Sequence, residues 1–197
     1  MARRLDYAQA DFVDRFADLL ASKRESDLDV FAAVADILAD VRQHGDEALL
    51  QLTAKFDRLQ CERIVDLAIG QDEMNAALAN LDPALRDALQ VAATRIRAFH
   101  EKQMPEGFTY SDEDGVVLGM RYTPVDAAGL YVPGGKAVYP SSVLMNAIPA
   151  TVAGVARRVV VVPAPDGFVS PMVLAAAALG EVTEMWRIGG AQAVAAL

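Results

Sequence analysis

The sequence predicts an α/β protein whose first half is helical and whose second half contains a small parallel sheet. Apolar residues make up 53% of the 197 residues, which is enough for a packed core. Up to Met104 they recur at helical spacing, whereas after Pro124 short all-apolar runs alternate with longer helical ones. Such short runs are typical of strands buried on both faces of a parallel sheet and joined by right-handed crossovers.

The first 45 residues predict two helices with a break between them. Apolar residues fall on one helical face over residues 12–20. Ser26, followed three residues later by Asp29, predicts the N-terminal cap of the second helix. His44 and Gly45 predict its end, because a cation favours the last turn of a helix and glycine readily adopts a left-handed conformation.

Two further helices and a hairpin complete the first half. Residues 49–56 continue the helical spacing. The pair Asp82-Pro83 predicts another helix start, with a capping side chain followed by proline at the first helical position. The runs Phe108–Ser111 and Val116–Tyr122 flank an acidic turn and predict a β-hairpin. A change of pattern near residues 123–127 predicts a boundary between two parts of the chain.

Strands and helices alternate along the second half. In chain order we expect a strand, a helix, a strand, a helix and a strand at Ala128–Val132, Val143–Ala156, Val159–Val162, Pro171–Leu179 and Met185–Ile188. A last helix begins at Ala191 and has barely two turns. Because a sheet of three parallel strands with an unfinished helix is a poor end for a domain, we expect the N-terminal part of a longer protein.

Composition narrows the class of partner. The net charge is −9, from 18 basic and 27 acidic residues, so neither nucleic acid nor an anionic membrane is expected as the main partner. Cys61 is the sole cysteine, which excludes an internal disulfide and favours a reducing compartment. The N-terminus lacks the apolar core of a signal peptide. We therefore expect a cytoplasmic protein.

Few side chains in the sequence are suited to metal binding or to nucleophilic catalysis. His44 and His100 both fall near predicted helix ends, where a histidine is more often a surface residue than a ligand. Cys61 has no histidine beside it in the sequence that would activate its thiol. The sequence therefore predicts no catalytic residue and no metal ligand in this chain.

The turn after Val132 is the first candidate for ligand binding. It reads Pro133-Gly134-Gly135-Lys136, which departs from the G-x-G-x-x-G spacing of a dinucleotide fingerprint. Glycines still allow a ligand to approach the backbone, and the N-terminus of the next helix presents free N–H groups. The nearby polar residues are Lys136, which faces a phosphate or solvent, and Ser141 and Ser142, of which one is an expected N-cap.

Two side chains complete this candidate site. Tyr131 ends the strand before the turn, and in open α/β sheets ligands bind beyond such strand ends. Its alternative role is to fill the core. A second glycine turn, Gly189-Gly190, follows the last strand, and Gln192 lies in the first turn of the next helix. An amide both donates and accepts hydrogen bonds, as a nucleotide requires. Two such turns indicate a nucleotide-sized ligand without identifying it.

Three stretches of the chain resemble the histidinol dehydrogenase family. The strongest is AGLYVPGGKAVYPSSVLMNAIPATVAGV at Ala128–Val155, and the others are RIGGAQAVAAL at Arg187–Leu197 and DVRQHGDEALLQLTAKFDRL at Asp40–Leu59. The similarity extends over nearly the whole chain. It implies an aldehyde-dehydrogenase-like architecture of two α/β domains with incomplete Rossmann-like sheets, cut short in this chain.

The resemblance also implies a division of the chain. Residues 1–24 are expected to form an N-terminal helical extension. Residues 25–124 are expected to form the mostly helical first part of the catalytic domain, including the hairpin. Residues 125–197 are expected to form an incomplete Rossmann-like domain that binds NAD.

Activity and cofactors follow from the same resemblance. It implies a homodimeric, zinc-dependent enzyme that oxidises L-histidinol through the aldehyde to L-histidine with NAD. Tyr131 and Gln192 match family residues that contact NAD, and Pro133, Gly134, Gly135, Ser141 and Ser142 are candidate neighbours by position. The zinc ligands and the acid–base pair of the family match no residue here and are expected beyond Leu197.

Two alternatives remain. A related dehydrogenase could act on another small alcohol, such as a sulfonated diol, because substrate contacts are also expected beyond Leu197. Alternatively, the chain could be a non-catalytic nucleotide-binding module. The N-terminal fragment of a histidinol dehydrogenase, inactive alone, remains the principal expectation.

Overall fold

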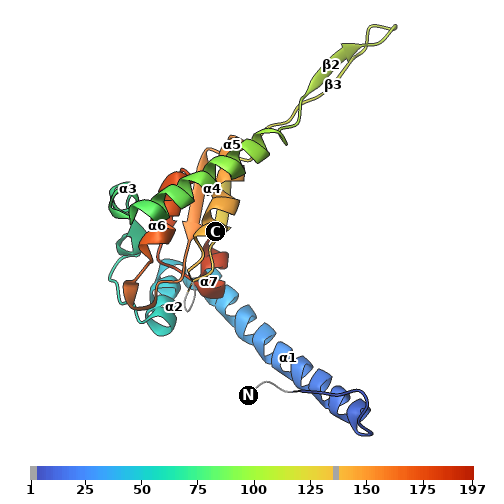
Figure 1. Cartoon of the computed structure of the whole chain (residues 1–197), viewed down its shortest axis with the longest axis vertical. Helices are drawn as coiled ribbons and strands as arrows, with labels where there is room; N and C mark the ends of the chain where they lie inside the picture. The colour runs from blue at the N-terminus through green and yellow to red at the C-terminus, as the bar shows by residue number, and fades with distance from the viewer. Residues whose placement is uncertain (1–3, 135–137) are drawn as a thin grey trace.

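The protein is a three-layer α/β structure with two long projections (Figure 1). The computed structural model describes residues 4–134 and 138–197, without the side chains of residues 21–28. Within these residues a four-stranded sheet has the order β1-β6-β5-β4. Its strands are β1 (Ala68–Ile69), β4 (Ala127–Tyr131), β5 (Arg157–Val161) and β6 (Glu184–Trp186). The predicted α/β class is therefore confirmed.

The sheet is mixed. β4, β5 and β6 are parallel to one another, as predicted, with Tyr131 opposite Val161 and Val161 opposite Trp186. β1 is antiparallel to β6, pairing Ile69 with Met185. The sequence analysis did not predict β1, because a two-residue strand has no periodicity to detect.

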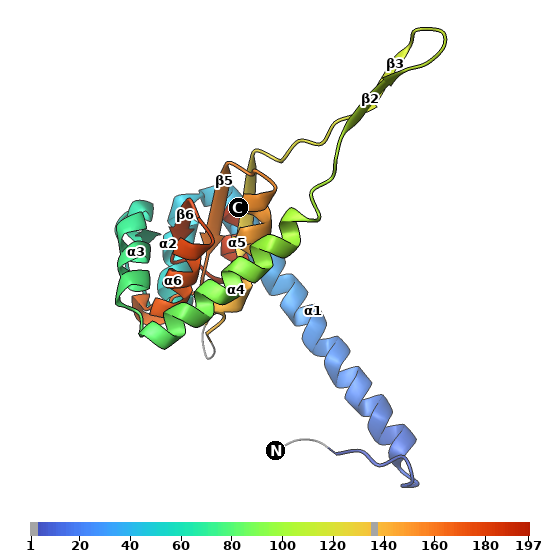
Figure 2. The same cartoon turned by 45° about the horizontal axis from the view of Figure 1, so that its top comes forward.

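Helices cover both faces of the sheet (Figure 2). One face packs against α3 (Gln71–Asn80), α4 (Pro83–Glu101), α5 (Pro140–Val152) and α6 (Pro171–Leu179). The opposite face packs against the C-terminal end of α1 (Phe12–His44), α2 (Asp46–Asp57) and α7 (Gly190–Ala196). Two short 3₁₀ helices, Ile64–Leu67 and Pro165–Gly167, lie in the connections.

Alternating valines of β5 divide the core into two parts. Val160 and Val162 pack on the side of α5 and α6, whereas Val161 packs on the side of α2 and α7. Successive side chains of a strand point to opposite faces, so the run of valines at 159–162 serves two helical layers. The prediction that this strand is buried on both faces is confirmed. β4, at the end of the sheet, is more exposed.

The prediction of a helix break at Ser26 is wrong. Residues 12–44 form a single helix of 33 residues, α1, which leaves the body as a long projection (Figure 1). A capping pattern specifies a start only when the preceding turn is not already helical, and here the helix runs through it. The predicted end is confirmed, because Gly45 has φ 56° and donates its N–H to Val41 at 2.8 Å.

The second projection is the predicted hairpin. β2 (Phe108–Ser111) and β3 (Val117–Met120) pair antiparallel, with Phe108 opposite Met120. At its tip, Asp112 accepts hydrogen bonds from the N–H groups of Asp114 and Val116. The side chains of both strands are exposed, so this ribbon stands away from the body (Figure 2).

Other boundaries follow the prediction with small shifts. α4 starts after Asp82, whose carboxylate accepts from the N–H groups of Ala84 and Leu85 as predicted. The sequence analysis missed α3, and α5 starts and ends three to four residues earlier than expected. None of the described helices is both long enough and apolar enough to span a membrane.

Candidate functional site

Three loops meet at the carboxyl ends of the parallel strands. They follow β4, β5 and β6 and include Gly134, Pro163 and Gly189 respectively. Pro163 lies between the two glycines. A Cβ built on Gly134 would lie 2.9 Å from the carbonyl oxygen of Pro163, and one built on Gly189 would lie 2.5 Å from its Cγ. The two predicted glycine turns therefore share one edge of the sheet, with a proline between them.

Tyr131 joins these two turns. It ends β4 and is half-buried, and its hydroxyl oxygen accepts a hydrogen bond from the N–H of Gly190 at 3.1 Å. Gly190 has φ 66°, a conformation that favours glycine, so the turn after β6 can present its N–H toward β4. The tyrosine therefore has a positioning contact across the site, in addition to any role in the core.

Gln192 is buried without a hydrogen-bond partner. Only 1% of the residue is exposed, and neither its Oε1 nor its Nε2 has a partner among the described residues. It lies in the first turn of α7, as predicted, and its Oε1 would be 2.5 Å from a Cβ built on Gly190. Buried amides are normally hydrogen-bonded, so this side chain offers a donor and an acceptor to an incoming group.

The serines do not cap α5. The N-cap is Tyr139, followed by Pro140, so Ser141 and Ser142 already lie inside the first turn. The prediction of a serine N-cap is wrong because proline at the first helical position starts the helix one residue before the serines. Ser142 donates its N–H to the carbonyl of Tyr139. The candidate residues Gly135 and Lys136 lie outside the described residues.

A small apolar hollow of about 110 Å³ adjoins the first turn. Pro133, Gly134, Pro163 and Phe168 are among the described residues that line it. Its walls suit a flat apolar group, and its volume is well below the ~300 Å³ at which small-molecule pockets begin. It therefore accommodates only part of a nucleotide.

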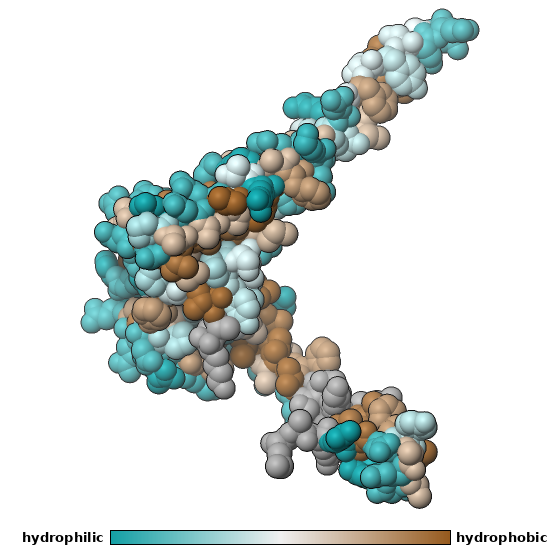
Figure 3. Space-filling view, in the orientation of Figure 1, coloured by the Kyte–Doolittle hydropathy of each residue, from teal (hydrophilic) through white to brown (hydrophobic). Residues whose placement is uncertain are grey.

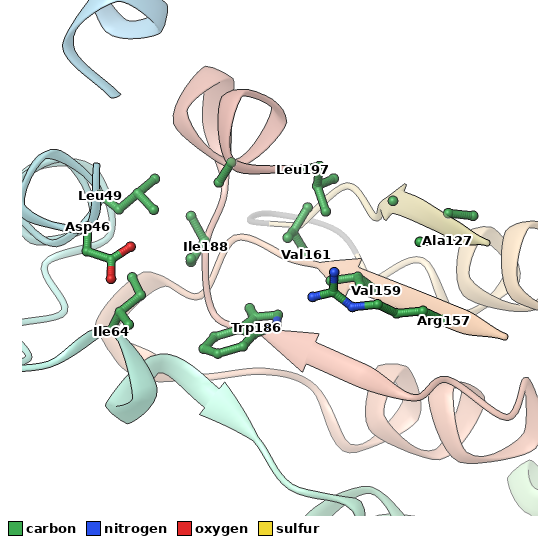
Figure 4. A pocket seen from close by; sticks show the side chains of 13 residues that line it. Asp46, Leu49, Ile64, Ala127, Arg157, Val159, Val161, Trp186, Ile188 and Leu197 are labelled. Atoms are coloured by element: carbon green, nitrogen blue, oxygen red, sulfur yellow. The ribbon is translucent and has the colours of Figure 1, made fainter. Parts of the chain in front are cut away.

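A larger hollow of about 320 Å³ lies elsewhere, on the sheet face below α7. Figure 4 shows Val159, Val161 and Trp186 forming its floor, with Leu197 above and Asp46 at one side. Arg157 extends over the floor, but its guanidinium is already paired with Glu184 at 2.7 Å. Neither Tyr131 nor Gln192 lines this space. We place the candidate site at the strand ends because Gln192, whose buried amide has two unpartnered polar atoms, is there.

Residues far away in the sequence support the middle loop, and sequence reasoning missed them. The carboxylate of Asp57 accepts a hydrogen bond from the N–H of Ala164, and Arg58 pairs with Asp166 through two hydrogen bonds of 2.8 and 2.6 Å. Burial raises the pKa of Asp57 from its ordinary 3.8. The sequence contains one signal, the adjacent charges of Asp57 and Arg58 at the end of an amphipathic helix, but this pattern does not indicate which residues they contact.

The histidines and the cysteine occupy structural positions. His44 contacts the Asp40 carboxylate at 2.7 Å and His100 contacts Gln103 at 2.6 Å, both at helix ends as predicted. Burial raises the pKa of the Cys61 thiol, which disfavours the reactive thiolate. Among the described residues no three His, Cys, Asp or Glu side chains gather where they could hold a metal ion. The donor set here does not fit zinc.

The fold and the site define an α/β protein with glycine turns at the carboxyl ends of parallel strands, where open sheets bind ligands. A family model described as histidinol dehydrogenase matches residues 20–197. The chain is 58% identical to the histidinol dehydrogenase of Rhodospirillum rubrum and 56% to that of Bradyrhizobium diazoefficiens, over its whole length. The chain belongs to the histidinol dehydrogenase family, a family of oxidoreductases.

A solved structure agrees with this assignment. The crystal structure of histidinol dehydrogenase from Elizabethkingia anophelis is 32% identical in sequence and superposes with a TM-score of 0.77. The match covers 85% of this chain and 38% of that one. The chain spans about 45% of the length of the curated relatives, 45% and 46% for the two bacterial enzymes above.

Proposed function

We propose that this chain supplies part of the NAD site of an enzyme that oxidises L-histidinol, through the aldehyde, to L-histidine. Membership of the histidinol dehydrogenase family supports the reaction and a role in histidine biosynthesis. The observation that carries the proposal is Gln192, a buried amide with two unpartnered polar atoms beside a glycine turn. The proposal includes a cytoplasmic location and a homodimer.

The residues at the strand ends fit a dinucleotide. Leaving a buried donor or acceptor unpaired costs about 1–3 kcal/mol, and a ligand that pairs with the Gln192 amide would recover this cost. Gly134 and Gly189 leave room for Pro163 between the two turns, and the Gln192 amide fills the space beside Gly190, so the three loops meet at the edge of the sheet where a dinucleotide would bind. The apolar hollow beside Pro133 and Phe168 suits a flat ring.

This chain's residues would bind and orient, and would not transfer protons. Gln192 would donate and accept hydrogen bonds, and Tyr131 would hold Gly190 in its place beside the Gln192 amide. Bound NAD supplies a hydride acceptor. Among the described residues no three His, Cys, Asp or Glu side chains gather where they could hold a metal ion, so the proposed zinc would be held by other residues of the enzyme.

The variant Gln192→Leu tests the proposal. Leucine keeps the volume and removes both unpartnered polar atoms, so the free energy of unfolding should stay unchanged or rise by about 1–2 kcal/mol. The dissociation constant for NAD should rise about tenfold or more, because the bound cofactor loses its amide partner. Calorimetric titration with NAD and urea unfolding measure the two quantities.

A control variant separates binding from general disturbance. Gln51→Leu alters an exposed glutamine of α2 that pairs only with Glu47, and should change neither NAD affinity nor stability beyond a few tenths of a kcal/mol. The proposed site is wrong if Gln192→Leu binds NAD as tightly as the unmodified chain. It is equally wrong if the unmodified chain does not bind NAD.

A further inference from the structure

We propose that the loop Pro163–Gly167, held by the C-terminal end of α2, positions both glycine turns of the site. Pro163 sets the spacing between Gly134 and Gly189, and Asp57 and Arg58 fix the place of Pro163. The contacts described below support this inference, and none of them involves a ligand. Its consequence for NAD affinity rests on the proposed function.

Pro163 is wedged between the turns. The Cβ position of Gly189 lies 2.5 Å from its Cγ and 2.6 Å from its Cβ, closer than real side chains approach. On the other side, the Cβ position of Gly134 lies 2.9 Å from its carbonyl oxygen and 3.1 Å from its Cδ. Glycine is therefore required on both sides, and a displacement of the proline ring would move both turns.

Three consecutive residues at the end of α2 hold this loop. Asp57, which is 6% exposed, accepts the N–H of Ala164, the residue next to Pro163. Arg58 donates two hydrogen bonds to Asp166, and the side chain of Leu59 packs on Gly167. Together these three residues contact the loop along its length, from Ala164, which follows the proline, to Gly167 at its end.

Arg58 and Asp166 also share an unusual backbone conformation. Both residues have φ 57°, a left-handed conformation that is uncommon for residues other than glycine, although aspartate adopts it more often than arginine does. A planar guanidinium binds a carboxylate in one orientation, so the paired hydrogen bonds favour one arrangement of both strained residues. The pair is exposed and adds little to overall stability. Its effect would be local, on the position of the loop.

Amide hydrogen exchange of the intact 197-residue chain tests the inference without a ligand. The Gly190 N–H is hydrogen-bonded to Tyr131, so its exchange rate reports the order of the second turn. In Arg58→Ala, exchange at Gly190 should accelerate about threefold to tenfold. The double variant Arg58→Asp with Asp166→Arg swaps the two charges and re-forms the ion pair. It should therefore restore most of the protection against exchange.

Arg63→Ala is the matched control. Arg63 makes a similarly exposed paired contact with Asp66, three residues away, and does not touch the loop. It should leave exchange at Gly190 unchanged. The inference is overturned if Arg58→Ala accelerates exchange only within residues 163–167, or if Arg63→Ala has the same effect at the turns.

A second measurement keeps the inference distinct from the proposed function. If NAD binds as proposed, its dissociation constant should rise in Arg58→Ala by about the same factor as the exchange rate at Gly190. If the unmodified chain does not bind NAD, the proposed function fails and the exchange result alone decides the positioning role. If NAD binds but its affinity in Arg58→Ala is unchanged, the consequence for the site is refuted.

Discussion

At the residue scale, Gln192 and Tyr131 differ in how their polar atoms are satisfied. The tyrosine hydroxyl has a backbone partner, the N–H of Gly190, whereas the glutamine amide has none among the described residues. Buried polar atoms without partners cost stability, and they persist where binding requires them. We therefore propose that Tyr131 positions the turn and that Gln192 recognises the ligand.

Gly190 is the residue between them, and its replacement should be costly. In Gly190→Ala, the added Cβ would lie 2.5 Å from Gln192 Oε1 in a backbone with φ 66°. Strain of this kind costs about 1–3 kcal/mol, so urea unfolding should show a loss of that size. Gly70→Ala is the control, since Gly70 has φ −74° and no atom within 4 Å of the added Cβ. Equal losses in the two variants would contradict the argument.

Asp57 predicts a pH dependence of stability. Burial raises the folded-state pKa of its carboxyl above the ordinary 3.8, so the folded state holds this proton more tightly than the unfolded state. The contribution of Asp57 to stability is therefore greatest below pH 3.8 and declines as pH rises through the folded-state pKa. Asp57→Asn removes this decline.

Unfolding measured between pH 3 and pH 7 checks the prediction for Asp57. The free energy of unfolding of Asp57→Asn, minus that of the unmodified chain, should increase with pH above about 4 and then level off. Asp87→Asn, at an exposed position on α4, serves as the control. The prediction is wrong if the difference in free energy of unfolding for Asp57→Asn falls as pH rises.

At the scale of elements, most of the length of α1 projects from the body of the protein. Its C-terminal end packs against α2 and α7, but the rest projects with large apolar side chains in solvent (Figure 3). Val30 is 57% exposed and Phe31 is 72% exposed. Apolar surface of this extent on a projecting helix is typical of a contact with another protein. The proposed homodimer would cover it.

Substitution of this surface should weaken self-association. Val30→Gln combined with Phe31→Gln keeps helix propensity and removes apolar area, so the dissociation constant of the dimer should rise about tenfold or more. Sedimentation equilibrium measures it. Phe99→Gln, at a 60% exposed phenylalanine of α4, is the control and should leave association unchanged. A monomeric unmodified chain would contradict the homodimer, as would equal effects of the two changes.

At the scale of the whole molecule, we propose that the chain holds groups that bind NAD without the groups for proton transfer. It spans about 45% of its curated relatives, and its described residues contain no cluster of metal ligands. We therefore predict no oxidation of L-histidinol by the purified 197-residue chain with NAD and zinc. Absorbance at the NADH wavelength measures this, with a full-length family member as the positive control. Zinc-dependent NADH formation by this chain would contradict the prediction.

The elements of the second half were predictable because each depends on local pattern. β4, β5, β6 and the helix Pro171–Leu179 follow from short apolar runs, glycine turns and proline starts. α1 was predicted as two helices because a capping motif at Ser26 looks the same whether or not a helix already passes through it. β1 was missed because its two residues are held by pairing with β6 alone.

The sequence by itself determined the class of the fold, the two glycine turns, the positions of Tyr131 and Gln192 and, by resemblance, the family. These depend on residues within a few positions of one another. Only the tertiary structure decided that Pro163 separates the turns, that Tyr131 reaches Gly190, that Gln192 is unpartnered, and that the end of α2 holds the middle loop. The physical reason is sequence distance: Asp57 and Ala164 are 107 residues apart, and no local pattern encodes which distant backbone group a buried carboxylate will find.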